Sequence, residues 1–191
     1  MKPFLKVIPL HKKESVLIQK AIKQNREAQR ILFDLYAPQM LSVCRTYVKD
    51  IQHAEEVMLN GFLKVFSHLK NYRSEGSFEG WVRRIMVRES ISFIRKQKQL
   101  VFSVEEIIPN KEQPNTIEAD LQVVEIQQLI DMLPDGYKVV FVMYAIEGYK
   151  HCEIASLLHI TEGTSKSQLY KARKMLQKGV KKLNTVNYGT N

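Results

Sequence analysis

Residues 149–183 read YKHCEIASLLHITEGTSKSQLYKARKMLQKGVKKL, and this stretch predicts two consecutive helices. Apolar residues recur at helical spacing over 154–158, and a tight break follows at 159–160. Thr161 is a candidate N-cap for the second, longer helix. A short helix, a turn and a longer helix predict a helix-turn-helix. The longer helix is expected to bury Leu169, Ala172, Leu176, Val180 and Leu183, with Ser165 in line one turn earlier.

The polar side of the second helix suits duplex DNA. Residues 163–182 contain seven basic residues and no acidic one, whereas a merely solvated amphipathic helix usually carries both signs. The side chains expected to face base edges in the major groove are those at the leading end, Thr161, Glu162, Gly163, Thr164, Lys166, Ser167 and Gln168. The side chains expected at the phosphates lie on one stripe, Lys171, Lys174, Lys178 and Lys181.

Helical periodicity also dominates the rest of the chain. Helices are predicted over 14–24 and 25–36, from Pro38 onward, after Asp50 for almost 20 residues and after Ser77, with Asn25, Asp50 and Ser77 as candidate N-caps. Further helices are predicted from Val123 to a stop at Pro134, and from there to Gly148. No convincing pair of strands with period-2 alternation occurs, so the predicted fold is all-α.

Charge divides the 191 residues into segments of opposite sign. Residues 1–102 carry a net +10, residues 103–126 carry −5 and contain two prolines, and residues 127–191 carry +4. This pattern predicts two small basic domains joined by an acidic linker. The expected boundaries are 1–100 and 123–183 for the domains, 101–122 for the linker and 184–191 for a tail.

Composition narrows the setting. With 45% apolar and 26% charged residues the chain reads as soluble and globular, and no apolar run reaches the roughly 18–20 residues of a membrane helix. Residues 1–14 lack the pattern of a signal peptide, so we expect a cytoplasmic protein without membrane insertion. Cys44 and Cys152 are expected to be reduced, packed thiols. The excess of nine positive charges predicts an anionic partner.

A second basic cluster lies at residues 70–98, where eight basic residues stand with aromatic residues among them and only three acids. Such a mixture holds single-stranded DNA, because bases stack on rings while cations follow the phosphates. Core spacing assigns Trp81 and Phe93 mainly to packing. Tyr72, Arg73 and the loop at 74–77 are the exposed candidates.

Catalytic and metal-binding motifs are sparse. The five histidines are scattered, and the adjacent pair His151 and Cys152 lacks the two further ligands of a zinc site. No glycine-rich phosphate loop, nucleophile elbow or HExxH motif occurs. We therefore expect no enzyme, no cofactor and no metal.

Two blocks in this order resemble an extracytoplasmic-function (ECF) sigma factor, a small bacterial RNA polymerase initiation subunit related to the primary sigma factors. DIQHAEEVMLNGFLKVFSHL (50–69) and YRSEGSFEGWVRRIMVRESISFIRK (72–96) are similar to sigma region two. LPDGYKVVFVMYAIEGYKHCEIASLLHITEGTSKSQLYKARKML (133–176) is similar to sigma region four. The resemblance covers roughly 20–100 and 123–182, and it implies a sigma factor that directs core polymerase to specific promoters and helps open them.

The resemblance also implies roles for individual residues. Region two would dock on the clamp of the polymerase largest subunit through Glu55, Glu56, Leu59, Asn60 and Phe62. It would hold the opened minus-ten element with Tyr72, Arg73, Ser74, Arg83, Arg84 and Arg88. Region four would read the minus-thirty-five element with Thr161, Glu162, Thr164, Lys166, Ser167, Gln168, Lys171 and Lys174. The remaining partners implied are the flap of the second-largest subunit and an anti-sigma factor.

The chain departs from the usual family pattern at several of these positions. Leu59 and Asn60 stand where Gln and an acid are usual, and Arg88 stands where Asn is usual. Ser165 replaces an apolar residue, and His159 stands where Gly is common.

Two alternatives come from other classes of protein. A stand-alone helix-turn-helix regulator would need a ligand or dimerisation domain in its first 100 residues, and the basic, aromatic stretch WVRRIMVRESISFIRK (81–96) argues against one. A cationic adaptor for membrane surfaces would need aromatic anchors on the apolar face of 166–182, which has none.

Overall fold

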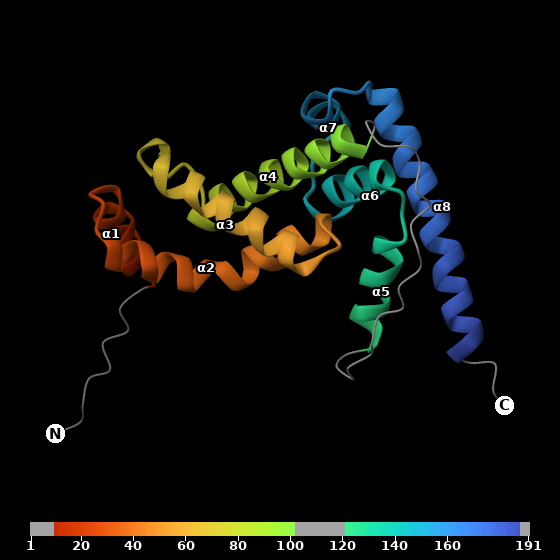
Figure 1. Cartoon of the computed structure of the whole chain (residues 1–191), viewed down its shortest axis with the longest axis horizontal. Coiled ribbons are helices and arrows are strands. Elements are labelled where there is room, and N and C mark those ends of the chain that lie inside the picture. Colours follow the sequence, from red (N-terminus) through yellow and green to blue (C-terminus); the bar gives the residue numbers. More distant parts are fainter. Residues whose placement is uncertain (1–9, 102–120, 188–191) are drawn as a thin grey trace. The chain divides into compact units, whose positions relative to one another are not determined.

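The computed structural model describes residues 10–101 and 121–187, and in these ranges the backbone forms helices and no strand. The all-α prediction is confirmed. The elements are α1 (Leu10–Ile22), α2 (Arg26–Tyr47), α3 (Ile51–Ser67), the 3-10 turn η1 (Leu69–Asn71), α4 (Phe78–Val101), α5 (Leu121–Asp131), α6 (Asp135–Phe141), the π-helical turn η2 (Val142–Ile146), α7 (His151–Leu158) and α8 (Glu162–Asn187) (Figure 1).

The chain forms two compact units that meet in the sequence between Phe93 and Ile94. Helix α5 begins at Leu121, two residues before the predicted start. Most of the predicted acidic linker, residues 102–120, lies outside the described residues, as does the end of the tail.

Four predicted N-caps are confirmed by hydrogen bonds. The backbone N–H groups of Ala28, His53, Gly80 and Thr164 donate to the side chains of Asn25, Asp50, Ser77 and Thr161, at 2.9, 2.8, 3.1 and 3.0 Å. Each bond satisfies a backbone donor at a helix start that has no partner within the helix.

The prediction that Pro38 begins a new helix is wrong. Helix α2 runs from Arg26 to Tyr47 with Pro38 inside it. Proline removes one helical hydrogen bond and costs about 3 kcal/mol in a helix interior. Here the buried face continues on both sides of the proline, from Leu32 and Tyr36 to Met40 and Val43, so the packing of one long face offsets that cost.

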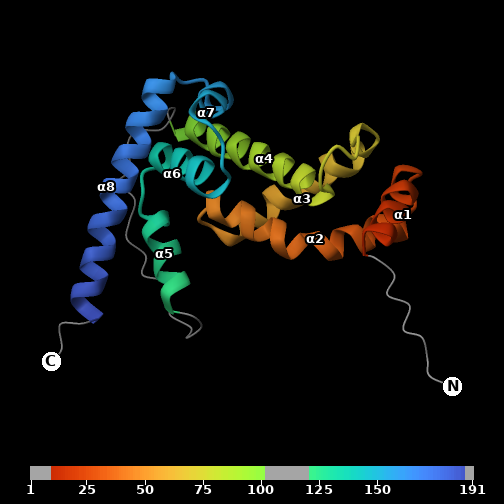
Figure 2. The same cartoon turned by 180° about the vertical axis from the view of Figure 1, so that it is seen from behind.

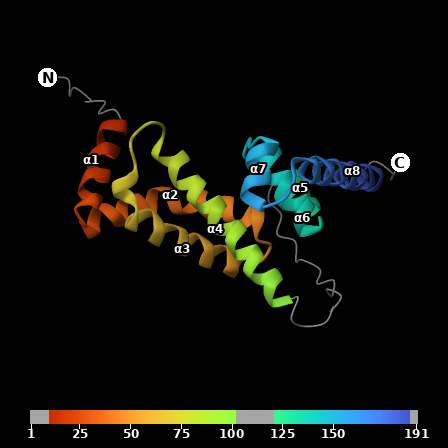
Figure 3. The ribbon, with the colours of Figure 1, turned by 90° about the horizontal axis from the view of Figure 1, so that it is seen from above.

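The core of the N-terminal unit forms where α4 crosses α2 and α3 (Figure 3). The rings of Tyr36 and Phe78 meet edge to face, 5.5 Å apart, between α2 and α4. Helix α3 approaches α4 closely at Gly61, where an added Cβ atom would lie 2.3 Å from the sulfur of Met86. These contacts hold the N-terminal part of α4 against α2 and α3. Because the loop 72–77 leads directly into the first turn of α4, the same contacts help to position that loop.

In the C-terminal unit, α5 lies along the C-terminal half of α8, and α6 and α7 pack against the N-terminal half (Figures 1 and 2). Lys138 of α6 is 1% exposed, and its Nζ donates to the Asp131 carboxylate at 2.6 Å. Leu129 of α5 lies against Gly179 of α8, where a Cβ atom would come within 2.5 Å of it.

The predicted seam of α8 is confirmed at Ser165, Leu169 and Ala172, which are buried. It is wrong at Val180, which is 42% exposed, and the side chain of Leu183 lies outside those described. The reason is that α6 and α7 pack mainly against the leading turns of α8, whereas the later turns, which meet α5 and the Phe141 side of α6, are covered less completely.

The two cysteines differ in environment. Cys44 is buried, but Cys152 is exposed, so the prediction of a packed thiol is wrong for Cys152. Burial raises the pKa of the Cys44 thiol to about 11, and a hydrogen bond with Ser90 offsets part of the rise. Cys44 therefore keeps its proton at neutral pH.

We expect one fast-reacting thiol in the native chain. Cys152 should react with Ellman's reagent near neutral pH, and Cys44 should react only after denaturation, because it is both buried and protonated. Stopped-flow absorbance in native buffer and in guanidinium measures both rates. The substitution Cys152→Ser should abolish the fast phase and Cys44→Ser should leave it. Equal native rates for the two thiols would contradict the described core.

Candidate nucleic-acid interface

The turn between α7 and α8 is built by local hydrogen bonds. His159 ends α7 in the left-handed region, with φ at +53°, and the N–H of Ile160 donates to the carbonyl of Ala155 at 3.0 Å. Thr161 then caps α8. This geometry is the short turn of a helix-turn-helix, in which the second helix is presented to the major groove.

The predicted base-facing residues gather at the start of α8. Thr161, Glu162, Lys166 and Ser167 are exposed, while Thr164 is half-buried. Glu162 and Lys166 form a loose ion pair on the helix surface at 3.9 Å.

Two predicted residues of α8 lean toward the start of α6. Gln168 is half-buried, with its amide beside Gly136, at 3.4 Å from where a Cβ atom would stand. The Lys171 ammonium lies 5.8 Å above the ring centre of Tyr137. Both side chains thus lie close to α6 on one flank of α8.

The outward face of α8 is cationic. Lys174, Lys178 and Lys181 are exposed on the side opposite the seam of Ser165 and Leu169. Tyr170, 66% exposed, is a surface residue of the same helix that the sequence analysis did not select. In the sequence, the position of Tyr170 away from the apolar seam of the helix could have indicated this exposure.

An apolar groove runs along the other flank of α8. It is lined by Phe141 of α6 and by Arg173, Leu176, Gln177, Val180 and Lys181 of α8. Its floor is hydrophobic and its charged lining groups are cations, so it suits an amphipathic segment with acidic residues.

The second predicted cluster surrounds the loop 72–77. The Tyr72 hydroxyl donates to the carbonyl of Gly76 at 2.7 Å, and the Tyr72 ring meets those of Phe78 and Trp81 at 5.3 and 5.6 Å. Tyr72 is therefore half-buried, and the prediction that it is exposed is wrong, because its ring packs on the start of α4. Trp81 stacks on Phe78, and its predicted packing role is confirmed.

The polar members of this cluster are accessible. Arg73 and Ser74 are exposed at the loop tip, and Ser74 adopts the left-handed region with φ at +57°. On α4, Arg84 and Arg88 are exposed and Arg83 is half-buried. A rigid aromatic base thus holds a loop next to a row of guanidinium groups.

The third predicted set lies on α3, where the four side chains Glu55, Glu56, Leu59 and Asn60 are exposed. Phe62 is only 3% exposed and packs edge to face on Phe33 at 4.8 Å, so it supports this surface from below. Leu63, which was not among the predicted residues, is 69% exposed one turn after Leu59.

Comparison with known proteins places both halves in one family. Residues 32–99 match the model of Sigma-70 region 2, and residues 124–176 match that of Sigma-70, region 4. The ECF RNA polymerase sigma factor SigW of Bacillus subtilis is 25% identical over 185 residues, which cover 88% of this chain and 99% of SigW. The RNA polymerase sigma factor SigV of that species is 27% identical over 132 residues, 69% of this chain and 78% of SigV.

The chain belongs to the ECF branch of the sigma-70 family. It is an RNA polymerase sigma factor, a DNA-binding protein of transcription initiation, as the resemblance predicted. The stand-alone regulator is not favoured, because the models of sigma regions 2 and 4 both match the chain, in that order.

Solved structures agree on the fold of the sigma factor. The sigma factor RpoE, in its complex with the anti-sigma factor NepR from Bartonella quintana, matches with a TM-score of 0.54 at 19% identity, covering 80% of this chain and 96% of RpoE. CnrH, in its complex with the cytosolic domain of CnrY, matches with a TM-score of 0.50 at 17% identity, covering 88% and 97%.

Two kinds of feature are absent from the described residues. Within 10–101 and 121–187, no helix has both the length and the hydropathy needed to cross a membrane. In the same part of the sigma factor, no group of three or more His, Cys, Asp or Glu side chains is placed to hold a metal ion.

We expect the cations of α8 to set the salt dependence of DNA binding. Lys171→Ala and Lys174→Ala should each flatten the slope of log affinity against log salt by about 1 unit, because each removes one phosphate contact. Fluorescence anisotropy of promoter duplexes at several salt concentrations measures the slope. Lys20→Ala, an exposed lysine of α1, is the control and should leave it unchanged. Wild-type slopes in both α8 variants would remove these residues from the phosphate contacts.

Proposed function

We propose that this sigma factor directs core RNA polymerase to promoters with two elements, which its two units bind separately. The observation that supports this proposal most directly is the capped helix-turn-helix. Its second helix exposes polar side chains at its N-terminal end and lysines farther along the helix. Thr161, Glu162, Thr164, Lys166, Ser167 and Gln168 read the minus-thirty-five element in the major groove. Lys171 and Lys174 hold its backbone.

We assign the opened minus-ten element to the loop 72–77 and α4. Base extraction costs a few kcal/mol, which contacts with the loop and with nearby cations offset. Tyr72, Arg73 and Ser74 receive the base at the loop. The guanidinium groups of Arg83, Arg84 and Arg88 hold the adjacent phosphates.

We assign polymerase docking to two surfaces. The exposed face of α3, with Glu55, Glu56, Leu59, Asn60 and the newly found Leu63, binds the clamp of the largest subunit. The groove between α6 and α8 takes the flap of the second-largest subunit. In this arrangement residues 1–100 and 123–183 act as the two binding domains, joined by residues 101–122, with 184–191 as a tail.

Control by an anti-sigma factor fits the same surfaces. RpoE and CnrH are found in complexes with NepR and with the cytosolic domain of CnrY. A free protein with a net charge of +9 would also bind DNA nonspecifically. A partner protein bound over its basic surfaces would prevent that binding. We propose that an anti-sigma factor covers them, that the protein acts in the cytoplasm, and that it catalyses no reaction by itself.

The test is run-off transcription with bacterial core polymerase on a pool of promoter fragments. We expect initiation that depends on the sigma factor, and a shared pair of sequence elements upstream of the active start sites. If the protein bound duplex DNA but neither bound core polymerase nor supported initiation, it would instead be a stand-alone regulator.

The exposed leucines of α3 provide a second test. Leu63→Glu should weaken binding to core polymerase by at least tenfold, which corresponds to a loss of about 1.4 kcal/mol of binding free energy. The reason is that the substitution places a charge in an apolar contact. Competition with a labelled sigma factor measures the affinity. Val16→Glu, on an α1 residue that is 53% exposed, is the matched control and should bind normally. Normal binding by Leu63→Glu would exclude this face.

A further inference from the structure

A chain of three contacts crosses the helix-turn-helix. The Ser165 hydroxyl on α8 lies 2.8 Å from Nδ1 of His151, the first residue of α7. The His151 ring stacks on Tyr144 of η2, with 4.6 Å between ring centres and 23° between planes. The Arg173 guanidinium on α8 lies 5.5 Å from the centre of the Tyr144 ring.

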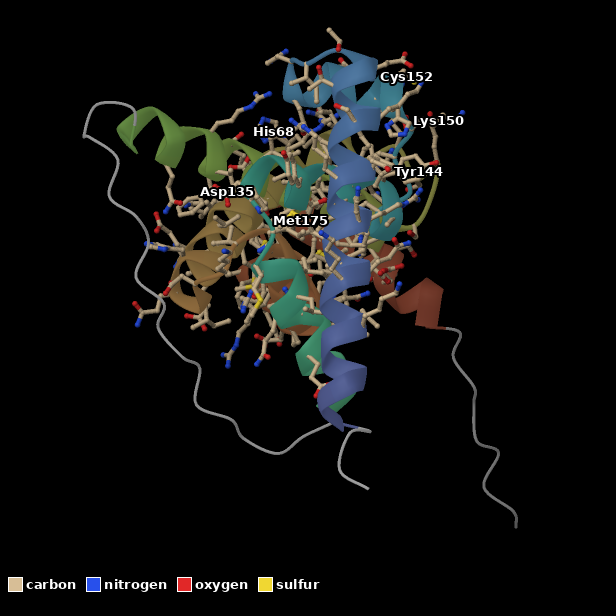
Figure 4. The ribbon with its side chains drawn as sticks, turned by 90° about the vertical axis from the view of Figure 1, so that its right-hand side faces the viewer. His68, Asp135, Tyr144, Lys150, Cys152 and Met175 are labelled. Carbon is tan, nitrogen blue, oxygen red and sulfur yellow. The ribbon has the colours of Figure 1, made fainter. Side chains whose placement is uncertain are left out.

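The contacts begin and end on the same helix. Ser165 and Arg173 are eight residues apart, which is about 12 Å along α8. Between them, His151 and Tyr144 belong to elements that precede the turn, and Figure 4 labels Tyr144 beside α8. Two separated points of α8 are therefore tied to one stack of rings, so the contacts resist tilting of the helix as well as sliding.

The hydrogen bond takes the place of ordinary packing. Ser165 is fully buried in the seam, and a buried hydroxyl without a partner is costly. His151 supplies that partner, and the bond forms in either tautomer because each group can donate or accept. The pair thus specifies one arrangement of α7 against α8, whereas two apolar groups would tolerate several.

Base reading and phosphate binding differ in their demand for accuracy. Hydrogen bonds to base edges need side chains placed to a fraction of an ångström, whereas flexible lysines reach phosphates over a range of helix positions. We propose that His151 is a positioning residue, which sets the sequence preference of α8 through Ser165 and Tyr144. The proposal rests on the proposed function only in that α8 reads duplex DNA.

The test compares sequence-specific and nonspecific binding by the full chain. Duplexes selected by the wild-type protein from a random pool, and shuffled versions of them, serve as probes. His151→Phe keeps the stacked ring and removes the hydrogen bond, and His151→Asn keeps a hydrogen-bonding group and removes the ring. Both should reduce the ratio of selected to shuffled affinity by roughly fivefold to tenfold, with the salt slope unchanged.

Three controls separate positioning from stability. All binding is measured well below the thermal midpoint of each variant, so loss of folded protein does not contribute. Tyr144→Phe keeps the ring and should keep the wild-type ratio. His53→Ala removes a histidine that lies beside the ring of Phe93 in the N-terminal unit, and it should also keep the ratio.

The pair with Ser165 gives the sharpest outcome. Ser165→Ala should reduce the ratio as His151→Phe does, and the double variant should be no worse than either single one, because both remove the same bond. Wild-type ratios in all folded His151 and Ser165 variants would overturn the proposal, as would additive losses. A wild-type protein without sequence preference would overturn it too. Run-off transcription decides the proposed function independently.

Discussion

The narrow seam that anchors α8 is the constraint on which the DNA-binding surface depends. Along the leading turns Ser165, Leu169 and Ala172 are buried and Thr164 and Gln168 are half-buried, so most of the circumference of the helix faces solvent. That seam must position the helix accurately with a small contact area, because every side chain added to the seam is lost from the surface that we propose meets DNA. Ring contacts from α6 and η2 to Lys171 and Arg173 supply order beyond the seam itself.

In the N-terminal unit the candidate DNA-binding loop is supported by a broad core instead of a narrow seam. Helix α4 is held by a broad core, which includes Phe78, Val82, Met86 and Ile91, and the loop before it rests on stacked rings. The loop tip can therefore remain exposed without losing its shape. A rigid loop beside guanidinium groups is suited to a single strand, whereas a narrow, presented helix is suited to a duplex.

Much of this was predictable from local sequence signals. The caps at Asn25, Asp50, Ser77 and Thr161 depend on one side chain and a backbone group three residues away, and all four are present. The turn of the helix-turn-helix is equally local. Composition and spacing also placed Trp81 in the packing.

The features that could not be predicted depend on tertiary contacts. Pro38 lies within a helix because packing on both sides outweighs a local preference. Val180 is exposed because α8 continues past α6 and α7. Lys138 pairs with Asp131, and His151 pairs with Ser165, only because the fold brings these residues together. Their spacing in the sequence does not indicate that they are partners.

The most direct test of the central claim is permanganate footprinting of promoter DNA bound by core polymerase. The account predicts that thymines of the minus-ten element become reactive only when the sigma factor is present, and that exchanging Arg84 and Arg88 for alanine reduces this reactivity. Promoter opening that is the same with and without the sigma factor would contradict the account.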